Sequence, residues 1–115
     1  MRIISTRELK ELIEHGKGYV LIDVRKQEEH RHGMLPTAQA IPIDELEAAL
    51  VMAPAEFLKK YGFPYPTRTM IIFYCRSGGR SRVAAEIAHR KGLDACSYAG
   101  GILEWSKTDR KVKAY

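Results

Sequence analysis

The sequence lacks the long hydrophobic runs, the cysteine density and the internal repeats that mark several classes of protein. None of its 115 residues belongs to a stretch that approaches the roughly 20 apolar residues needed to cross a bilayer, so a membrane span is not expected. The N-terminus has no apolar core of a signal peptide, because charged side chains recur from position 7. With 45% hydrophobic and 29% charged residues, the chain is expected to form one globular domain.

Acidic residues do not balance the basic ones, but the excess is small and unevenly placed. Of the net charge of +5, +3 falls in residues 107–115, which hold four basic residues and one acidic residue. We therefore expect a domain over residues 1–106, followed by a basic, solvated C-terminal tail over 107–115. The remaining charge does not indicate binding to nucleic acid, although a modest positive bias suits a small anionic substrate.

Cysteine is scarce, since only Cys75 and Cys96 are present. Two cysteines are too few for a disulfide scaffold, and the absence of a CxxC pair argues against a zinc site or a thioredoxin motif. This usage predicts a reducing compartment, namely the cytoplasm, or the mitochondrial matrix if a leader has been removed. In such a compartment a lone cysteine among unusual neighbours is a candidate nucleophile.

Hydrophobic patterning alternates between strands and helices along the chain. Apolar runs predict strands at residues 3–4, 19–24, 70–74 and 95–98, with a short extended piece around 40–43. Helices are expected after a capping box formed by Ser5 and Glu8, after a cap at Asp44, from Pro54, and over residues 82–91. This order predicts an α/β domain with a mostly parallel central sheet and helices on both faces.

The segment with the clearest chemistry joins the strand at 70–74 to the following helix. It reads Cys-Arg-Ser-Gly-Gly-Arg-Ser over residues 75–81, at the edge of the sheet where ligands of α/β proteins bind. Backbone N–H groups of such a loop and of the helix N-terminus stabilise an anion, and Arg76 and Arg80 add positive charge. These groups are expected to lower the pKa of Cys75 and so to favour a reactive thiolate.

Two other interpretations of this segment are weaker. Cys75 could be a small buried hydrophobic residue, but its Arg, Gly and Ser neighbours do not suit an apolar pocket. A nucleotide phosphate loop would need Gly-Lys followed by Ser or Thr, which is absent.

Four segments, which follow one another along the chain in the same order as in that family, resemble the rhodanese-type sulfurtransferases. Residues 75–81 are similar to that family's active-site loop, residues 21–25 (Leu-Ile-Asp-Val-Arg) to its Asp-Val-Arg strand end, and residues 98–105 to its closing Gly-Gly…Trp segment. Residues 30–38 followed by Ile41-Pro42 correspond to its Gly-His-Ile-Pro-Gly-Ala region, although positions 33–38 read Gly-Met-Leu-Pro-Thr-Ala here. The length most resembles the single-domain thiosulfate sulfurtransferases, including the thiosulfate:glutathione type.

The resemblance implies transfer of the sulfane sulfur of thiosulfate, or of a similar donor, through a persulfide on Cys75. The implied acceptors are glutathione, thioredoxin or cyanide, and no metal or organic cofactor is required. The implied catalytic residue is Cys75. The implied donor-binding residues are those of the loop: Arg76, Ser77, Gly78, Gly79, Arg80 and Ser81.

Three alternatives share this fold. A dual-specificity phosphatase needs five residues between its cysteine and arginine, whereas four separate Cys75 from Arg80. A rhodanese-like binding module generally lacks the loop cysteine, which this chain has. A persulfide relay that delivers sulfur to a protein partner uses the same Cys75 chemistry and differs only in its acceptor.

Other notable residues are interpreted as structural. Asp23 and Arg25 lie at a strand end next to the Cys75 strand and could support the pocket, although an acid there more often pairs with a nearby base. His30 and His32 lack the further ligands of a metal site. Packing roles are expected for Tyr74, Cys96, Tyr98 and Trp105, with Cys96 as a resolving thiol the alternative, and His89 is expected on the surface.

Overall fold

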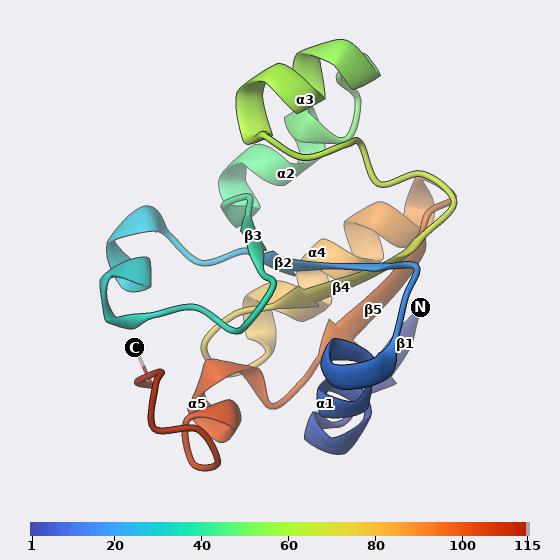
Figure 1. Ribbon diagram of the computed structural model, residues 1–115. Helices are drawn as coiled ribbons and strands as arrows, with labels where there is room; N and C mark the ends of the chain where they lie inside the picture. The colour runs from blue at the N-terminus through green and yellow to red at the C-terminus, as the bar shows by residue number, and fades with distance from the viewer. Residues whose placement is uncertain (115) are drawn as a thin grey trace.

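The chain is built on a central sheet whose strands all run parallel. The computed structural model describes residues 1–114. The strand order is β1-β5-β4-β2-β3, as Figure 1 shows. The five strands are β1 (Arg2–Ile4), β2 (Tyr19–Asp23), β3 (Gln39–Ala40), β4 (Met70–Tyr74) and β5 (Asp94–Tyr98). The predicted parallel α/β architecture is confirmed.

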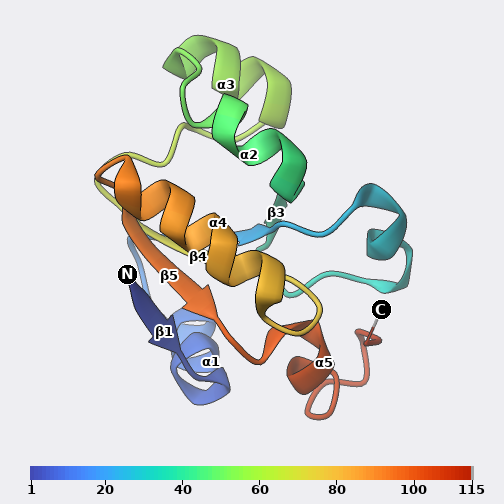
Figure 2. The same ribbon diagram turned by 180° about the vertical axis from the view of Figure 1, so that it is seen from behind.

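Helices cover both faces of this sheet, seen from opposite sides in Figures 1 and 2. One face is covered by α2 (Ile43–Ala49), α3 (Pro54–Tyr61) and α4 (Gly79–Arg90). The other face is covered by α1 (Thr6–His15) and α5 (Gly101–Trp105). A short 3₁₀ helix, η1 (Gln27–His32), follows β2. No helix among residues 1–114 has the length and hydrophobicity needed to cross a membrane.

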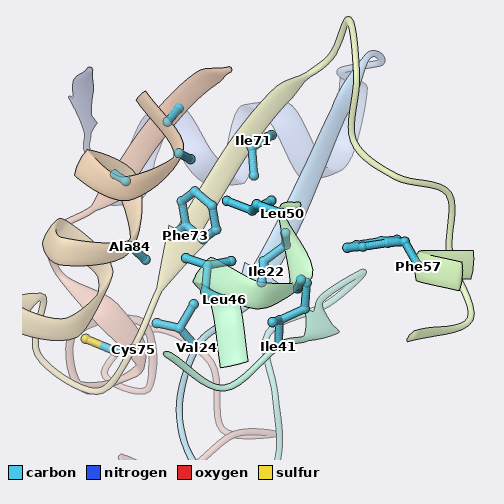
Figure 3. Close-up of a cluster of buried hydrophobic side chains, with 14 of the residues drawn as sticks. Ile22, Val24, Ile41, Leu46, Leu50, Phe57, Ile71, Phe73, Cys75 and Ala84 are labelled. Atoms are coloured by element: carbon cyan, nitrogen blue, oxygen red, sulfur yellow. The ribbon is translucent and has the colours of Figure 1, made fainter. Parts of the chain in front are cut away.

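Strand β4 lies at the centre of the sheet and contributes to two cores. Ile71 and Phe73 pack under α2 and α4, whereas Ile72 and Tyr74 pack toward α1 and α5, because alternate side chains of a strand point to opposite faces. Figure 3 shows the first of these cores, with Cys75 at one end of the apolar cluster. The strand is therefore buried on both faces, which explains why its sequence is continuously apolar.

The predicted helix ends are partly confirmed. The capping box is present, since the Glu8 N–H donates to Ser5 Oγ at 3.1 Å and the Ser5 N–H donates to Glu8 Oε1 at 3.0 Å. Pro54 opens α3, as predicted. The predicted cap at Asp44 is wrong, because Pro42 is the N-cap of α2 and Asp44 lies within its first turn.

Helix α4 begins at Gly79, three residues before the predicted start, because Gly78 adopts a left-handed conformation (φ 102°) that turns the chain directly into the helix. The end of the helix is as expected, with Gly92 just beyond it at φ 81°.

The basic side chains of residues 107–113 are exposed, as expected of a solvated tail, but the segment also contacts the rest of the domain. The Trp105 Nε1–H donates to Asp109 Oδ2 at 3.0 Å, and Val112 is buried in the same core as Leu35. The Lys113 N–H donates to the His32 carbonyl oxygen at 3.3 Å. The chain therefore returns toward η1 after α5, since one apolar side chain in the basic stretch is buried there.

Candidate active site

Cys75 lies immediately after β4, where the chain leaves the sheet and turns into α4. Its thiol is free and only 1% of the residue is exposed. The Gly78 N–H donates to Cys75 Sγ at 3.1 Å, so the loop folds back over the sulfur. In Figure 3 the residue sits beside the loop between β4 and α4. The structure thus places Cys75 where the sequence predicted it, at the carboxyl edge of the sheet.

Opposing effects act on the Cys75 thiol. Burial raises its pKa, but hydrogen bonds, chiefly from the backbone N–H groups of Ser81, Gly78 and Ser77, lower it further than burial raises it. The net pKa of Cys75 is below the ordinary thiol value. The site therefore favours a thiolate and equally favours any anionic sulfur at the same position.

The loop is held in place by the first turn of α5. The Ile102 N–H donates to the Cys75 carbonyl oxygen and the Leu103 N–H donates to the Arg76 carbonyl oxygen, both at 3.0 Å. Gly101 has φ +63°, and a Cβ there would collide with the Arg76 carbonyl. Gly78 is similarly restricted, because a Cβ would lie 2.5 Å from the Ala99 carbonyl oxygen. The close approach of the two backbones therefore requires glycine at both positions.

The buried hydroxyl groups of Ser81 on α4 and Ser97 on β5 support the loop. Ser81 Oγ donates to the Gly78 carbonyl oxygen at 3.1 Å and lies 3.0 Å from Ser97 Oγ on β5. Both serines are buried. Ser97 therefore acts on the loop through Ser81. Sequence reasoning missed it because a serine in a short strand carries no distinctive signal.

Arg80 does not present the free positive charge expected from the sequence. Its guanidinium group donates to both carboxylate oxygens of Glu29, with Nη1 2.6 Å from Oε1 and Nη2 2.9 Å from Oε2. These hydrogen bonds lower the pKa of Glu29 to about 2, so the carboxylate is ionised at neutral pH. Arg76, in contrast, is exposed. Sequence reasoning missed Glu29 because 51 residues separate it from Arg80.

Asp23 and Arg25 form a buried ion pair beside the loop rather than within it. Arg25 Nη2 lies 2.8 Å from Asp23 Oδ2. The same guanidinium group donates to the carbonyl oxygens of Glu29 and Gly33 at 3.2 and 3.0 Å. The pair therefore anchors the η1 segment, including the residue that binds Arg80, against the end of β2.

The histidines predicted on this segment are not equivalent. His30 is largely buried, with Nε2 3.4 Å from Asp23 Oδ1, whereas His32 is exposed. Within residues 1–114, no group of three or more His, Cys, Asp or Glu side chains is arranged to hold a metal ion.

The remaining side chains interpreted as structural are where packing requires them. Tyr74, Cys96, Tyr98 and Trp105 are buried in the core under α1 and α5, and His89 is exposed on α4, as predicted. Burial raises the pKa of the Cys96 thiol, the opposite of the net effect at Cys75. Cys96 thus lies in an environment that favours the neutral thiol.

Comparison with known proteins places this geometry in a family. Rhodanese-like domains match the chain over residues 5–108. The chain belongs to the rhodanese-like domain family. This match covers all four of the segments that carried the resemblance in the sequence, and it confirms the predicted family.

Individual relatives agree with this assignment. The human thiosulfate:glutathione sulfurtransferase is 38% identical over 105 residues, covering 89% of this chain and 90% of that protein. A mitochondrial relative from Schizosaccharomyces pombe is 39% identical over 92 residues, and this match covers 78% of the chain but only 65% of the relative. The solved structure of a human single-domain sulfurtransferase superposes with a TM-score of 0.89 at 36% identity, covering 95% of this chain and 98% of that one. The predicted enzyme class, a sulfurtransferase, is confirmed by these relatives.

Proposed function

We propose that this rhodanese-like domain is a thiosulfate sulfurtransferase in which Cys75 carries the sulfur. The observation that supports this most strongly is the buried Cys75 thiol inside a loop of backbone N–H groups, which lower its pKa despite burial. The match to a human relative covers most of both proteins, and that relative is named thiosulfate:glutathione sulfurtransferase. This name supports the choice of donor and acceptor.

The first half-reaction forms a persulfide. The Cys75 thiolate attacks the outer sulfur of thiosulfate, a new S–S bond forms, and the old S–S bond breaks with its electron pair leaving on sulfite. The enzyme then holds Cys75–S–S⁻. The N–H groups of Ser77, Gly78 and Ser81 that favour the thiolate also stabilise this anion, as preorganised donors do for other anionic intermediates.

The second half-reaction returns the enzyme to its starting state. A thiolate acceptor attacks the outer sulfur of the persulfide and becomes a persulfide itself, while the electron pair of the broken bond returns to Cys75. Cyanide takes the same sulfur to give thiocyanate. We propose glutathione, thioredoxin or cyanide as acceptors. Both half-reactions balance without a cofactor.

The loop supports sulfur transfer over phosphoryl transfer. Only four residues separate Cys75 from Arg80, and Cys75 is almost fully enclosed, so the reacting atom of a donor must be free of bulky substituents. A terminal sulfur meets this requirement better than a phosphoryl group with its three oxygens. The substrate-binding residues in this proposal are those of the loop: Arg76, Ser77, Gly78, Gly79, Arg80 and Ser81.

The two free, buried cysteines support a reducing compartment, for which we propose the cytoplasm, with the mitochondrial matrix as the alternative. Some relatives are named as mitochondrial.

A donor and acceptor panel tests the function. Sulfite release from thiosulfate is measured with glutathione, reduced thioredoxin or cyanide, and with an aryl phosphate as the phosphatase control. We expect catalytic turnover with at least one thiol and negligible release of phosphate. One equivalent of sulfite per chain without turnover on small thiols would instead indicate a persulfide relay to a protein partner, and robust phosphate release would contradict the proposal.

A further inference from the structure

The ion pair between Glu29 and Arg80 has a consequence for which donors the site accepts. Arg80 lies in the first turn of α4, two residues after Gly78, whose N–H binds the Cys75 sulfur. Both carboxylate oxygens of Glu29 are hydrogen-bonded to this guanidinium group, at 2.6 and 2.9 Å. We propose that Glu29 determines donor specificity, by neutralising Arg80 and thereby favouring singly charged sulfane donors relative to doubly charged ones.

Hydrogen bonds hold Glu29 where its carboxylate can neutralise Arg80. Its backbone carbonyl accepts a hydrogen bond from buried Arg25 at 3.2 Å, and its Oε1 accepts one from the Lys26 N–H at 3.0 Å. The η1 segment that carries it is thereby fixed to the end of β2. Its carboxylate is ionised at neutral pH, because Arg80 holds its pKa to about 2. The negative charge is therefore a permanent part of the site.

Arg80 lies between two residues that hold the Cys75 site, since the Gly78 N–H donates to Cys75 Sγ at 3.1 Å and Ser81 Oγ donates to the Gly78 carbonyl oxygen at 3.1 Å. In keeping with this proximity, a Cys75 thiolate raises the pKa of Arg80. A donor bound at Cys75 is therefore in the field of both Arg80 and Glu29. Coulombic energies scale with the charge of the ligand, so the negative charge of Glu29 opposes a dianion twice as strongly as a monoanion in the same position. Glu29 thus reduces the advantage that Arg80 alone would give to thiosulfate.

This inference rests on the proposed sulfur transfer, and it is tested with two donors that differ in charge. Thiosulfate is a dianion that releases sulfite, and methanethiosulfonate is a monoanion that releases methanesulfinate, each on transfer of one terminal sulfur to Cys75. Glu29→Gln removes the charge and keeps the size of the side chain. We expect the ratio of kcat/KM for thiosulfate to that for methanethiosulfonate to rise by roughly threefold or more, and the rise to shrink at high ionic strength.

Glu28→Gln is the matched control, because Glu28 is an exposed neighbour on the same 3₁₀ helix and its replacement changes the net charge equally. We expect it to leave the donor ratio unchanged. An unchanged ratio in Glu29→Gln, or equal changes in the two variants, would overturn the inference. An equal loss for both donors in Glu29→Gln would also overturn it, because it would show that Glu29 only holds the loop together.

A second readout separates this inference from the proposed function. Cys75 is alkylated with iodoacetate, a monoanion, and with iodoacetamide, which is neutral. Glu29→Gln is expected to raise the ratio of the rate constant for iodoacetate to that for iodoacetamide. This holds whether or not the protein turns over thiosulfate. If the ratio rises while neither sulfur donor reacts, the sulfurtransferase proposal fails and charge control by Glu29 stands. If the ratio does not rise, charge control fails independently of catalysis.

Discussion

The two cysteines of this chain are both free and almost completely buried, yet their surroundings differ in kind. Cys75 follows β4 and lies inside a loop of N–H donors, whereas Cys96 lies within β5, paired with Ile72. Cys96 packs in the apolar core under α1 and α5. Burial raises the pKa of both thiols, but only at Cys75 do hydrogen bonds from the backbone reverse the effect.

This difference shows that burial alone does not decide in which direction the pKa of a thiol shifts. A sulfur enclosed mainly by apolar side chains stays protonated: at Cys96 the nearby Arg2 lowers the thiol pKa by less than burial raises it, so the lost water is not fully replaced. A sulfur enclosed by oriented N–H groups has its solvent replaced by fixed dipoles. The lowered pKa of Cys75 is therefore a property of the loop, and the loop depends on residues outside it.

Displacing the loop around Cys75 should have the largest effect on the difference between the two cysteines. Gly101→Ala places a Cβ against the Arg76 carbonyl and disturbs the two hydrogen bonds that α5 donates to the loop. We expect kcat/KM for thiosulfate to fall by about 100-fold, the order of loss produced by small misplacements of reacting groups.

Gly92→Ala is the matched control for this substitution. Gly92 also has a left-handed φ, but a Cβ there meets no atom within 4 Å, and the residue lies at the far end of α4. It should lose about 1 kcal/mol of stability from backbone strain and retain activity. Equal kinetic effects of the two substitutions, measured on protein shown to be folded by circular dichroism, would contradict this account of the loop.

A smaller effect on Cys75 is expected from a change on β5, at the serine that contacts Ser81. Ser97→Ala removes the hydroxyl group that contacts Ser81, which in turn holds Gly78. Because the pKa of Cys75 is lowered in the intact site, its alkylation by iodoacetamide should rise through a midpoint below the usual thiol range. We expect Ser97→Ala to move that midpoint upward by roughly half a pH unit, so activity is lost mainly at low pH and recovers as pH rises.

Cys96→Ala serves as the control because Cys96 is the preceding residue of β5 and faces the other core. It should lower stability by about 1 kcal/mol and leave the midpoint unchanged. An unchanged midpoint in Ser97→Ala would show that Ser97 contributes only to packing.

Much of the fold was predictable because its signals are local. The continuous apolar run of β4, the capping box at Ser5 and the proline that opens α3 each follow from residues close in sequence. The start of α4 was missed because Gly79 is a poor helix former, and only the left-handed Gly78 fixes the turn.

The site was predictable only in its centre. The loop around Cys75 is contiguous in sequence, so its chemistry could be inferred directly. The residues that contact this loop or pair with its Arg80 come from elsewhere: Glu29 from η1, Ser97 from β5 and Gly101 from α5. Their partners are set by the topology of the sheet, which is why the pairing of Arg80 could not be foreseen and its charge was expected to be free.

The central claim is that sulfur is carried by Cys75 and not by Cys96. The most direct measurement is the intact mass of the protein after treatment with thiosulfate, followed by peptide mapping, on the unmodified chain and on Cys75→Ser and Cys96→Ser. We predict one added sulfur, mapped to Cys75, in the unmodified protein and in Cys96→Ser, and none in Cys75→Ser, because a hydroxyl group cannot carry the persulfide. Added sulfur on Cys96, or its loss in Cys96→Ser, would contradict the single-cysteine mechanism.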